Sequence, residues 1–208
     1  SAFNANAWAD LFAASGAGYV VLVTKHHDGY CLWPSAVANP HMPGWASRRD
    51  FVGELCNAVR ARGMRFGLYY SGGLDWTFRH VPISNFGDML ACVPTAEDYR
   101  CYAASQVREL VARYHPSVLW NDIAWPSEAD LPSLFADYYS AVPDGVVNDR
   151  WLGMTSLFEG LRETTARGVF NAMVKGRIAE AGGAVDNPPP LHCDFRTVEY
   201  STGAHMGE

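Results

Sequence analysis

Hydrophobic and polar residues alternate along this chain in a repeating unit of one helix followed by one strand. The unit recurs four times before residue 152, each time as an amphipathic stretch and then an apolar run. The expected helices cover residues 7–15, 49–62, 96–114 and 131–142, and the expected strands cover residues 19–24, 64–70, 117–120 and 145–147. Strands that alternate with helices are typical of a parallel sheet. The run at 19–24 is apolar throughout, which predicts a strand buried on both faces.

Polar and aromatic residues follow each expected strand at once, in the clusters KHHDGY, YYSGGLDW, WNDIAW and NDRW. In parallel α/β folds ligands bind beyond the carboxyl ends of the strands, so these clusters form the candidate site. No Gly-x-Gly-x-x-Gly run follows a strand and no P-loop motif is present, which leaves a nucleotide-binding fold without support. A barrel is therefore a better prediction than a doubly wound sheet.

The regular rhythm stops after residue 151. Residues 152–191 contain one or two helical stretches and a loop rich in glycine and proline, and they form an atypical insertion in the pattern. An extended stretch at 194–200 follows, and it contains Glu199.

Composition narrows the class of protein. The 208 residues are 49% hydrophobic, and no apolar run approaches the ~20 residues of a membrane span. The chain has 16 Lys and Arg against 22 Asp and Glu, a net charge of −6, which argues against nucleic acid as a partner. The 7 Trp and 10 Tyr suit a core, and also a pocket that stacks against sugar rings. Five cysteines without Cys-x-x-Cys spacing indicate buried free thiols.

His26, His27 and Asp28 invite comparison with a metal site. Adjacent residues on a strand point to opposite faces, and no third histidine stands at ligand spacing, so we predict no metal and no cofactor. Two alternatives remain. Both imidazoles bind a polar ligand at the strand end, or one histidine is buried and the other exposed.

Asp122 is the most informative carboxylate, because it follows an apolar strand and lies between Trp120 and Trp125. A carboxylate among aromatic side chains is costly unless it is paired or used in chemistry. The other interpretation is an N-cap for the helix that follows. Glu199 gains interest beside Asp122, because hydrolysis of a glycosidic bond typically needs two carboxyl groups.

Several of these motifs resemble a known family. The run YVVLVTKHHDGYCLWPS at 19–35 is similar to the signature of the family 29 glycoside hydrolases, the α-L-fucosidases. The resemblance continues through RRDFVGELCNAVRARGMRFGLYYSGGLDW at 48–76, YHPSVLWNDIAWP at 114–126 and VVNDRW at 146–151, and it returns in DFRTVEY at 194–200.

The resemblance implies a (β/α)8 TIM-like barrel and the retaining hydrolysis of terminal α-L-fucose from glycans or glycosides. Asp122 matches the nucleophile of the family motif, and Glu199 matches the general acid/base of one branch. The remaining matches are residues that contact or line the fucose pocket: His26, His27, Tyr69, Trp120 and Arg150. The implied partner is a fucosylated glycan or glycoside, and no cofactor is implied.

Two departures from the family pattern matter. The first family strand carries a His-Trp-Gly motif that is absent here, so we expect residues 1–208 to form an incomplete catalytic barrel whose true N-terminus is missing. Residues 1–10 show no signal peptide, and the compartment and oligomeric state stay open. The insertion at 152–191 leaves rivals to Glu199 as acid/base: Glu159, Glu163 and Asp194. The alternative function is an inactive or glycan-binding remnant of a fucosidase barrel.

Overall fold

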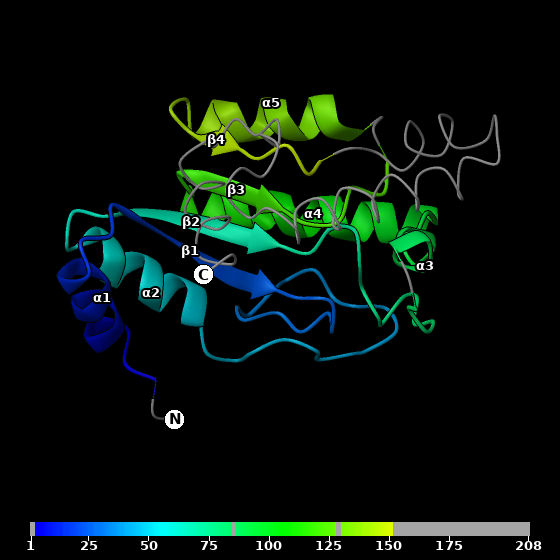
Figure 1. Ribbon diagram of the computed structural model, residues 1–208, viewed down its shortest axis with the longest axis horizontal. Coiled ribbons are helices and arrows are strands. Elements are labelled where there is room, and N and C mark those ends of the chain that lie inside the picture. Colours follow the sequence, from blue (N-terminus) through cyan, green and yellow to red (C-terminus); the bar gives the residue numbers. More distant parts are fainter. Residues whose placement is uncertain (1–2, 85, 128–129, 152–208) are drawn as a thin grey trace, which may run out of the picture.

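A computed structural model describes residues 3–84, 86–127 and 130–151. Its centre is a four-stranded parallel sheet in the order β1-β2-β3-β4 (Figure 1). The strands are β1 (Tyr19–Lys25), β2 (Arg65–Tyr70), β3 (Val118–Asn121) and β4 (Val146–Val147). The helices are α1 (Ala5–Ala14), α2 (Phe51–Arg60), α3 (Phe86–Ala91), α4 (Glu97–Tyr114) and α5 (Leu131–Ala141). The alternation of helices and parallel strands predicted from the sequence is confirmed.

The main core lies between one face of the sheet and the helices. Alternate residues of the central strand β2, namely Phe66, Leu68 and Tyr70, are fully buried against this helical layer. The pattern is that of a strand inside an α/β layer, because period-2 alternation sends every second side chain toward the helices. Gly67 lies between them, and a Cβ there would approach Val118 of β3 to 2.6 Å, so the close spacing of the two strands requires glycine.

The prediction that residues 19–24 are buried on both faces is wrong. Val20 and Leu22 pack against the main core, whereas Val23 on the other face is 40% exposed. That other face holds only a small described cluster, in which Tyr19, Val21 and Trp120 surround Val118. An unbroken apolar run therefore does not predict how completely each face of the strand is buried by the rest of the chain.

Local sequence explains where the helices begin and end. The side chain of Asn4 accepts a hydrogen bond from the amide of Ala7 at 3.1 Å, and that of Asp50 accepts one from Gly53 at 2.8 Å. Helix α4 ends at Tyr114, and the capping residue His115 takes a left-handed conformation with φ 44°. The six-residue helix α3 was missed by the sequence pattern, because it is too short to show a hydrophobic period.

The four described cysteines fit the prediction of free thiols, with one correction, and Cys193 lies outside the described residues. Cys31, Cys56 and Cys92 are free and buried, whereas Cys101 on α4 is exposed. The insertion at 152–191 lies outside the described residues. Among the helices described, none combines the length and apolar character needed to cross a membrane.

Candidate active site

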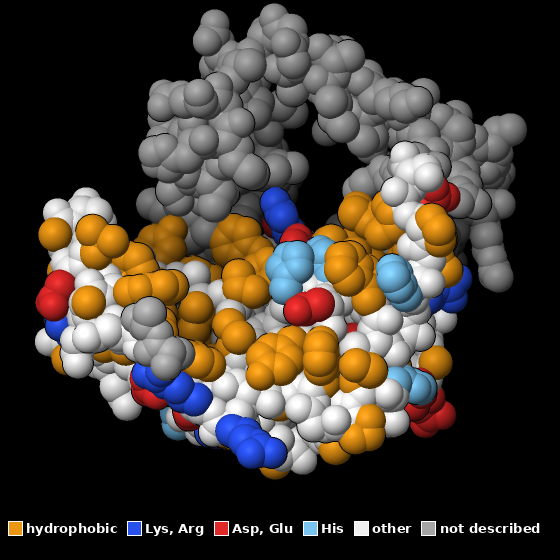
Figure 2. All heavy atoms as spheres, turned by 90° about the horizontal axis from the view of Figure 1, so that it is seen from below, with side chains coloured by type: hydrophobic (Ala, Val, Ile, Leu, Met, Phe, Trp, Pro, Cys, Tyr) orange, Lys and Arg blue, Asp and Glu red, His pale blue; other side chains and the backbone are white. Residues whose placement is uncertain are grey.

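Because the strands are parallel, their carboxyl ends meet at one edge of the sheet. Four segments lie there: residues 25–30 after β1, 69–76 at the end of β2, 121–125 at the end of β3 and 148–151 after β4. We call this group the strand-end site. Figure 2 shows histidine side chains beside acidic and hydrophobic ones on the face seen there.

Asp122 is held by two donors from neighbouring strand ends. Tyr69 donates its hydroxyl to Oδ2 at 2.8 Å, and Arg150 donates through Nη1 to Oδ1 at 3.0 Å. The carboxylate side chain is 19% exposed, so it is accessible from a partly desolvated position. Helix α5 begins only at Leu131, with Asp130 at its N-cap. The helix-cap interpretation of Asp122 is therefore wrong.

The conformation of the turn after β3 orients the carboxylate of Asp122. Ile123 and Ala124 both have left-handed backbones, with φ 62° and 78°, which is rare for a β-branched residue such as isoleucine. Gly73 donates its amide to the carbonyl of Asp122 at 3.1 Å, and Asn121 Nδ2 donates to the carbonyl of Ala124 at 2.7 Å. Strain of this kind persists only where the surroundings impose it, and it concentrates at functional sites.

Asn121 is an orienting residue that the sequence analysis missed. Its buried side chain accepts from the amide of Gly72 at 3.0 Å and donates to the carbonyl of Arg150 at 2.8 Å. It therefore ties the ends of β2 and β3 to the segment that carries Arg150. An asparagine next to the candidate nucleophile at a strand end was the available signal.

The hydroxyl of Tyr69 stays protonated at neutral pH. Burial, reinforced by the negative charge of Asp122, raises the pKa of Tyr69 well above its usual value. The hydroxyl therefore acts as a hydrogen-bond donor to Asp122 across the physiological range.

His26 and His27 lie together on one side of the chain. Their ring centroids are 3.9 Å apart, and the His26 ring stacks on Tyr69 at 5.9 Å with an interplanar angle of 10°. The strict alternation expected of strand residues does not apply, because β1 ends at Lys25 and a turn follows. The alternative with one buried histidine is wrong, because His26 is exposed and His27 is half-buried. Binding of one ligand by both imidazoles stays a prediction.

The proton on His27 can be assigned from its hydrogen bonds. Ser71 Oγ donates to the carbonyl of Leu74 at 2.8 Å, so it accepts from His27 Nδ1 at 2.7 Å. Burial, followed by the charge of His26, lowers the pKa of His27 to about 4. His27 is therefore neutral at neutral pH, and its Nε2 is an acceptor for a ligand hydroxyl.

Arg150 and Trp120 complete the wall around Asp122. The Arg150 guanidinium carbon lies 5.8 Å from the centre of the Trp120 ring, within the range of a cation–π contact. Trp120 belongs to β3 on the face of the sheet opposite the main core. It offers an apolar surface beside the carboxylate.

A fully buried ion pair adjoins the strand-end site, and the sequence did not predict it. Lys25 Nζ and Asp75 Oδ2 lie 2.8 Å apart, and both side chains are 0% exposed. The ammonium also lies 4.6 Å from the centre of the Tyr70 ring, and Asp75 Oδ1 accepts from Thr77 Oγ1 at 2.6 Å. The pair joins the end of β1 to the loop after β2. Its sequence signal was a lysine directly after an apolar run and an aspartate in a strand-end cluster.

The structure thus brings together all the predicted site residues that it describes. Glu199 lies outside the described residues, as do its rivals, Glu159, Glu163 and Asp194. Within the described ranges, no three His, Cys, Asp or Glu side chains are grouped closely enough to hold a metal ion.

Comparison with known proteins shows the family to which this chain belongs. Residues 1–177 match the family model described as alpha-L-fucosidase. The chain belongs to the alpha-L-fucosidase family. Tissue alpha-L-fucosidase of Bos taurus is 41% identical over 158 residues, which cover 72% of this chain and 32% of the relative. Plasma alpha-L-fucosidase of Rattus norvegicus is 42% identical, covering 72% and 33%. The chain therefore spans about a third of the length of these curated relatives.

Solved alpha-L-fucosidase structures share the fold. A Thermotoga maritima alpha-fucosidase in complex with fucose superimposes with a TM-score of 0.68 at 47% identity, covering 73% of this chain and 36% of that one. A Bacteroides thetaiotaomicron alpha-L-fucosidase of family 29 gives a TM-score of 0.56 at 27% identity, with 73% and 35% covered. Both similarities agree with the family resemblance found in the strand-end motifs.

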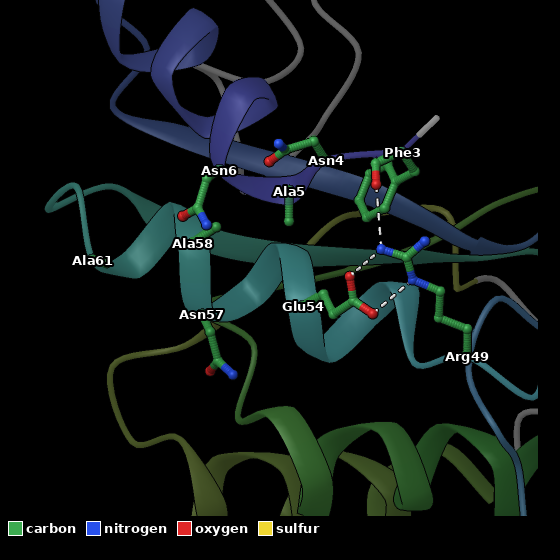
Figure 3. Close-up of a pocket in the computed structure, with 9 residues that line it drawn as sticks. All are labelled: Phe3, Asn4, Ala5, Asn6, Arg49, Glu54, Asn57, Ala58 and Ala61. Atoms are coloured by element: carbon green, nitrogen blue, oxygen red, sulfur yellow. Dashed lines mark hydrogen bonds and ion pairs between the residues drawn. The ribbon is translucent and has the colours of Figure 1, made fainter. Parts of the chain in front are cut away.

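In this alpha-L-fucosidase family chain, a cavity of about 540 Å³ lies away from the strand ends, between α1 and α2 (Figure 3). Its charged groups are satisfied by one another, since Arg49 donates to both carboxylate oxygens of Glu54 at 2.7 and 2.6 Å and also to the carbonyl of Phe3. No strand end contributes to its lining. The strand-end site, where the Asp122 carboxylate and two imidazoles lie close together, is therefore the candidate active site.

Proposed function

We propose that this chain supplies the nucleophile side of the active site of a retaining α-L-fucosidase. The observation that carries the proposal is the carboxylate of Asp122, held at a strand end by Tyr69 and Arg150. The stacked His26 ring adjoins Tyr69 and brings hydroxyl-binding groups to the same place. A carboxylate facing sugar-binding groups is what a double displacement at an anomeric carbon requires.

In the first step, Asp122 attacks the anomeric carbon of the bound fucose, and the bond from that carbon to the glycosidic oxygen breaks. Glu199 gives its proton to the departing oxygen, which leaves as a hydroxyl group. In the second step, Glu199 takes a proton from water, the water oxygen attacks the anomeric carbon, and the ester to Asp122 breaks. The released fucose has the configuration of the substrate.

The other residues hold the sugar. His26, His27, Tyr69 and Arg150 offer donors and acceptors for its hydroxyl groups, and Trp120 offers an apolar wall. Such contacts accelerate the reaction only to the extent that they strengthen in the transition state. The neutral His27 and the protonated Tyr69 hold one protonation state through neutral pH, which suits fixed recognition of neutral hydroxyl groups.

The parallel sheet is proposed to be part of an incomplete (β/α)8 TIM-like barrel. Four strands are described, against the eight of a closed barrel. In this view residues 1–208 are one partial catalytic domain, with residues 152–191 as an insertion. The partner is a fucosylated glycan or glycoside.

The test uses the protein encoded by the complete open reading frame that contains these residues. We call this protein the reading-frame product. We expect it to release fucose from an aryl α-L-fucoside, and NMR at early times should show the α anomer first. Initial release of the β anomer would contradict a retaining mechanism. Binding of fucose without any turnover would support the glycan-binding remnant instead.

The role of Glu199 is tested by leaving-group dependence. Glu199→Ala in the reading-frame product should slow fucosides with poor leaving groups far more than activated aryl fucosides, because only the former need protonation of the departing oxygen. The kcat/KM values of the two classes measure the difference. Equal slowing would exclude Glu199 and direct attention to Glu159, Glu163 and Asp194, each tested by the same substitution.

A further inference from the structure

An exposed aromatic pair adjoins the strand-end site and has no part in the mechanism above. Trp76, in the loop after β2, meets the His27 ring at 5.9 Å with an interplanar angle of 63°. His80 stacks on Trp76 at 5.7 Å and 27°. Although one imidazole stacks on the indole, 42% of Trp76 remains exposed. A large apolar surface is therefore open to solvent one ring beyond His27.

This surface is continuous with the catalytic residues. Tyr69 donates to Asp122 and stacks with His26, and His26 lies against His27, which meets Trp76. Trp76 therefore lies at the end of a continuous series of contacts that begins at the Asp122 carboxylate.

The loop that carries Trp76 is anchored on both sides. The amide of Trp76 donates to the carbonyl of His27 at 2.7 Å. Its neighbour Asp75 belongs to the fully buried ion pair with Lys25. Thr77 is bound in turn by Asn39 Nδ2 at 2.7 Å. Because the backbone is fixed from several directions, little backbone entropy is lost when a ligand packs on this loop.

We infer that Trp76 and His80 form a binding subsite for the sugar ring attached to the fucose, the leaving group of the proposed reaction. The apolar face of a pyranose packs on an aromatic ring. A solvent-exposed indole, which has an apolar ring and a polar N–H group, suits such a sugar, whose hydroxyl groups remain in contact with water. This inference rests on the proposed function. It adds a second recognition element, which selects glycans over substrates without a leaving-group sugar.

The test compares two substrates of the reading-frame product. One is α-L-fucosyl fluoride, whose single-atom leaving group cannot reach Trp76. The other is the fucosyl disaccharide that the unmodified protein hydrolyses fastest among the 1→2, 1→3, 1→4 and 1→6 linkages. Trp76→Ala should lower kcat/KM for the disaccharide about tenfold and leave the fluoride unchanged within about twofold. His80→Ala should show a smaller loss of the same selectivity.

Trp8→Ala is the matched control, since Trp8 is 47% exposed on α1, and α1 lies near the amino ends of the strands, away from their carboxyl ends (Figure 1). It should change neither substrate. Equal loss on both substrates by Trp76→Ala would overturn the subsite, because it would mean that Trp76 supports the fucose pocket. No loss on either would overturn it as well.

A second measurement separates this inference from the proposed function. If the unmodified protein hydrolyses neither substrate, the proposed function fails. Ligand binding is then measured from the NMR signal of the Trp76 indole, which is assigned as the signal missing in Trp76→Phe. A shift with the fucosyl disaccharides and none with L-fucose alone would support the subsite. No shift with any disaccharide would overturn it.

Discussion

Asp122→Asn is expected to abolish hydrolysis of aryl α-L-fucosides by the reading-frame product while leaving the protein folded. The substitution removes the nucleophilic charge but almost no volume. The amide oxygen can still accept from Arg150, and the amide nitrogen can donate to the Tyr69 hydroxyl, which accepts after rotating. We expect a loss of about four orders of magnitude or more in kcat, where each tenfold loss is ~1.4 kcal/mol of barrier. Steady-state kinetics measure the loss, and circular dichroism and thermal unfolding verify the fold.

Azide provides the decisive control for this role. In Asp122→Gly, azide should enter the vacated space, attack the anomeric carbon from the face that the carboxylate used, and form a fucosyl azide. Asp130→Asn is the matched control, because Asp130 is the N-cap of α5 and lies outside the strand-end site. Full activity of Asp122→Asn, or a loss of the same size in Asp130→Asn, would contradict the nucleophile assignment.

Lys25→Met is expected to cause the largest loss of stability. The pair between Lys25 and Asp75 is 0% exposed on both sides, so the substitution leaves a buried carboxylate without its counter-charge. Breaking such a pair typically costs about 3–5 kcal/mol, a large part of the ~5–15 kcal/mol that stabilises an ordinary domain. The free energy of unfolding in urea measures the loss.

The double variant Lys25→Met with Asp75→Leu should recover much of that loss, because no charge then remains buried. Arg108→Ala is the matched surface control. Its partner Asp137 lies 2.6 Å away, but the two side chains are 39% and 53% exposed, so the expected cost is below about 1 kcal/mol. A cost for Lys25→Met that is no larger than for Arg108→Ala would show that the buried pair is not required for stability.

The order of the strands and of four of the five described helices was readable from the sequence, because it depends on local periodicity, whereas the short helix α3 was not. The repeat of amphipathic helix and apolar run predicted β1 to β4 in order, and polar clusters marked the end of each strand. Parallel strands bring their carboxyl ends to one edge, so these clusters could be grouped as one site before any contact was known.

What each cluster residue touches was decided by the tertiary structure alone. Tyr69 and Asp122 are 53 positions apart in the chain, and Lys25 and Asp75 are 50 apart, yet each pair is in direct hydrogen bond. Asp122 could be read equally well as a helix cap until the start of α5 was seen at Leu131. Periodicity carries no information about such pairings.

The degree of burial was also beyond the sequence. The apolar run of β1 predicted two covered faces, but a side chain's exposure depends on what the rest of the chain places against it, and Val23 proved 40% exposed. The sequence by itself thus determined the βα rhythm, the family and the candidate residues. Only the tertiary structure decided which groups form hydrogen bonds, ion pairs and packing contacts. The energies of these interactions depend on distances between segments that are remote along the chain.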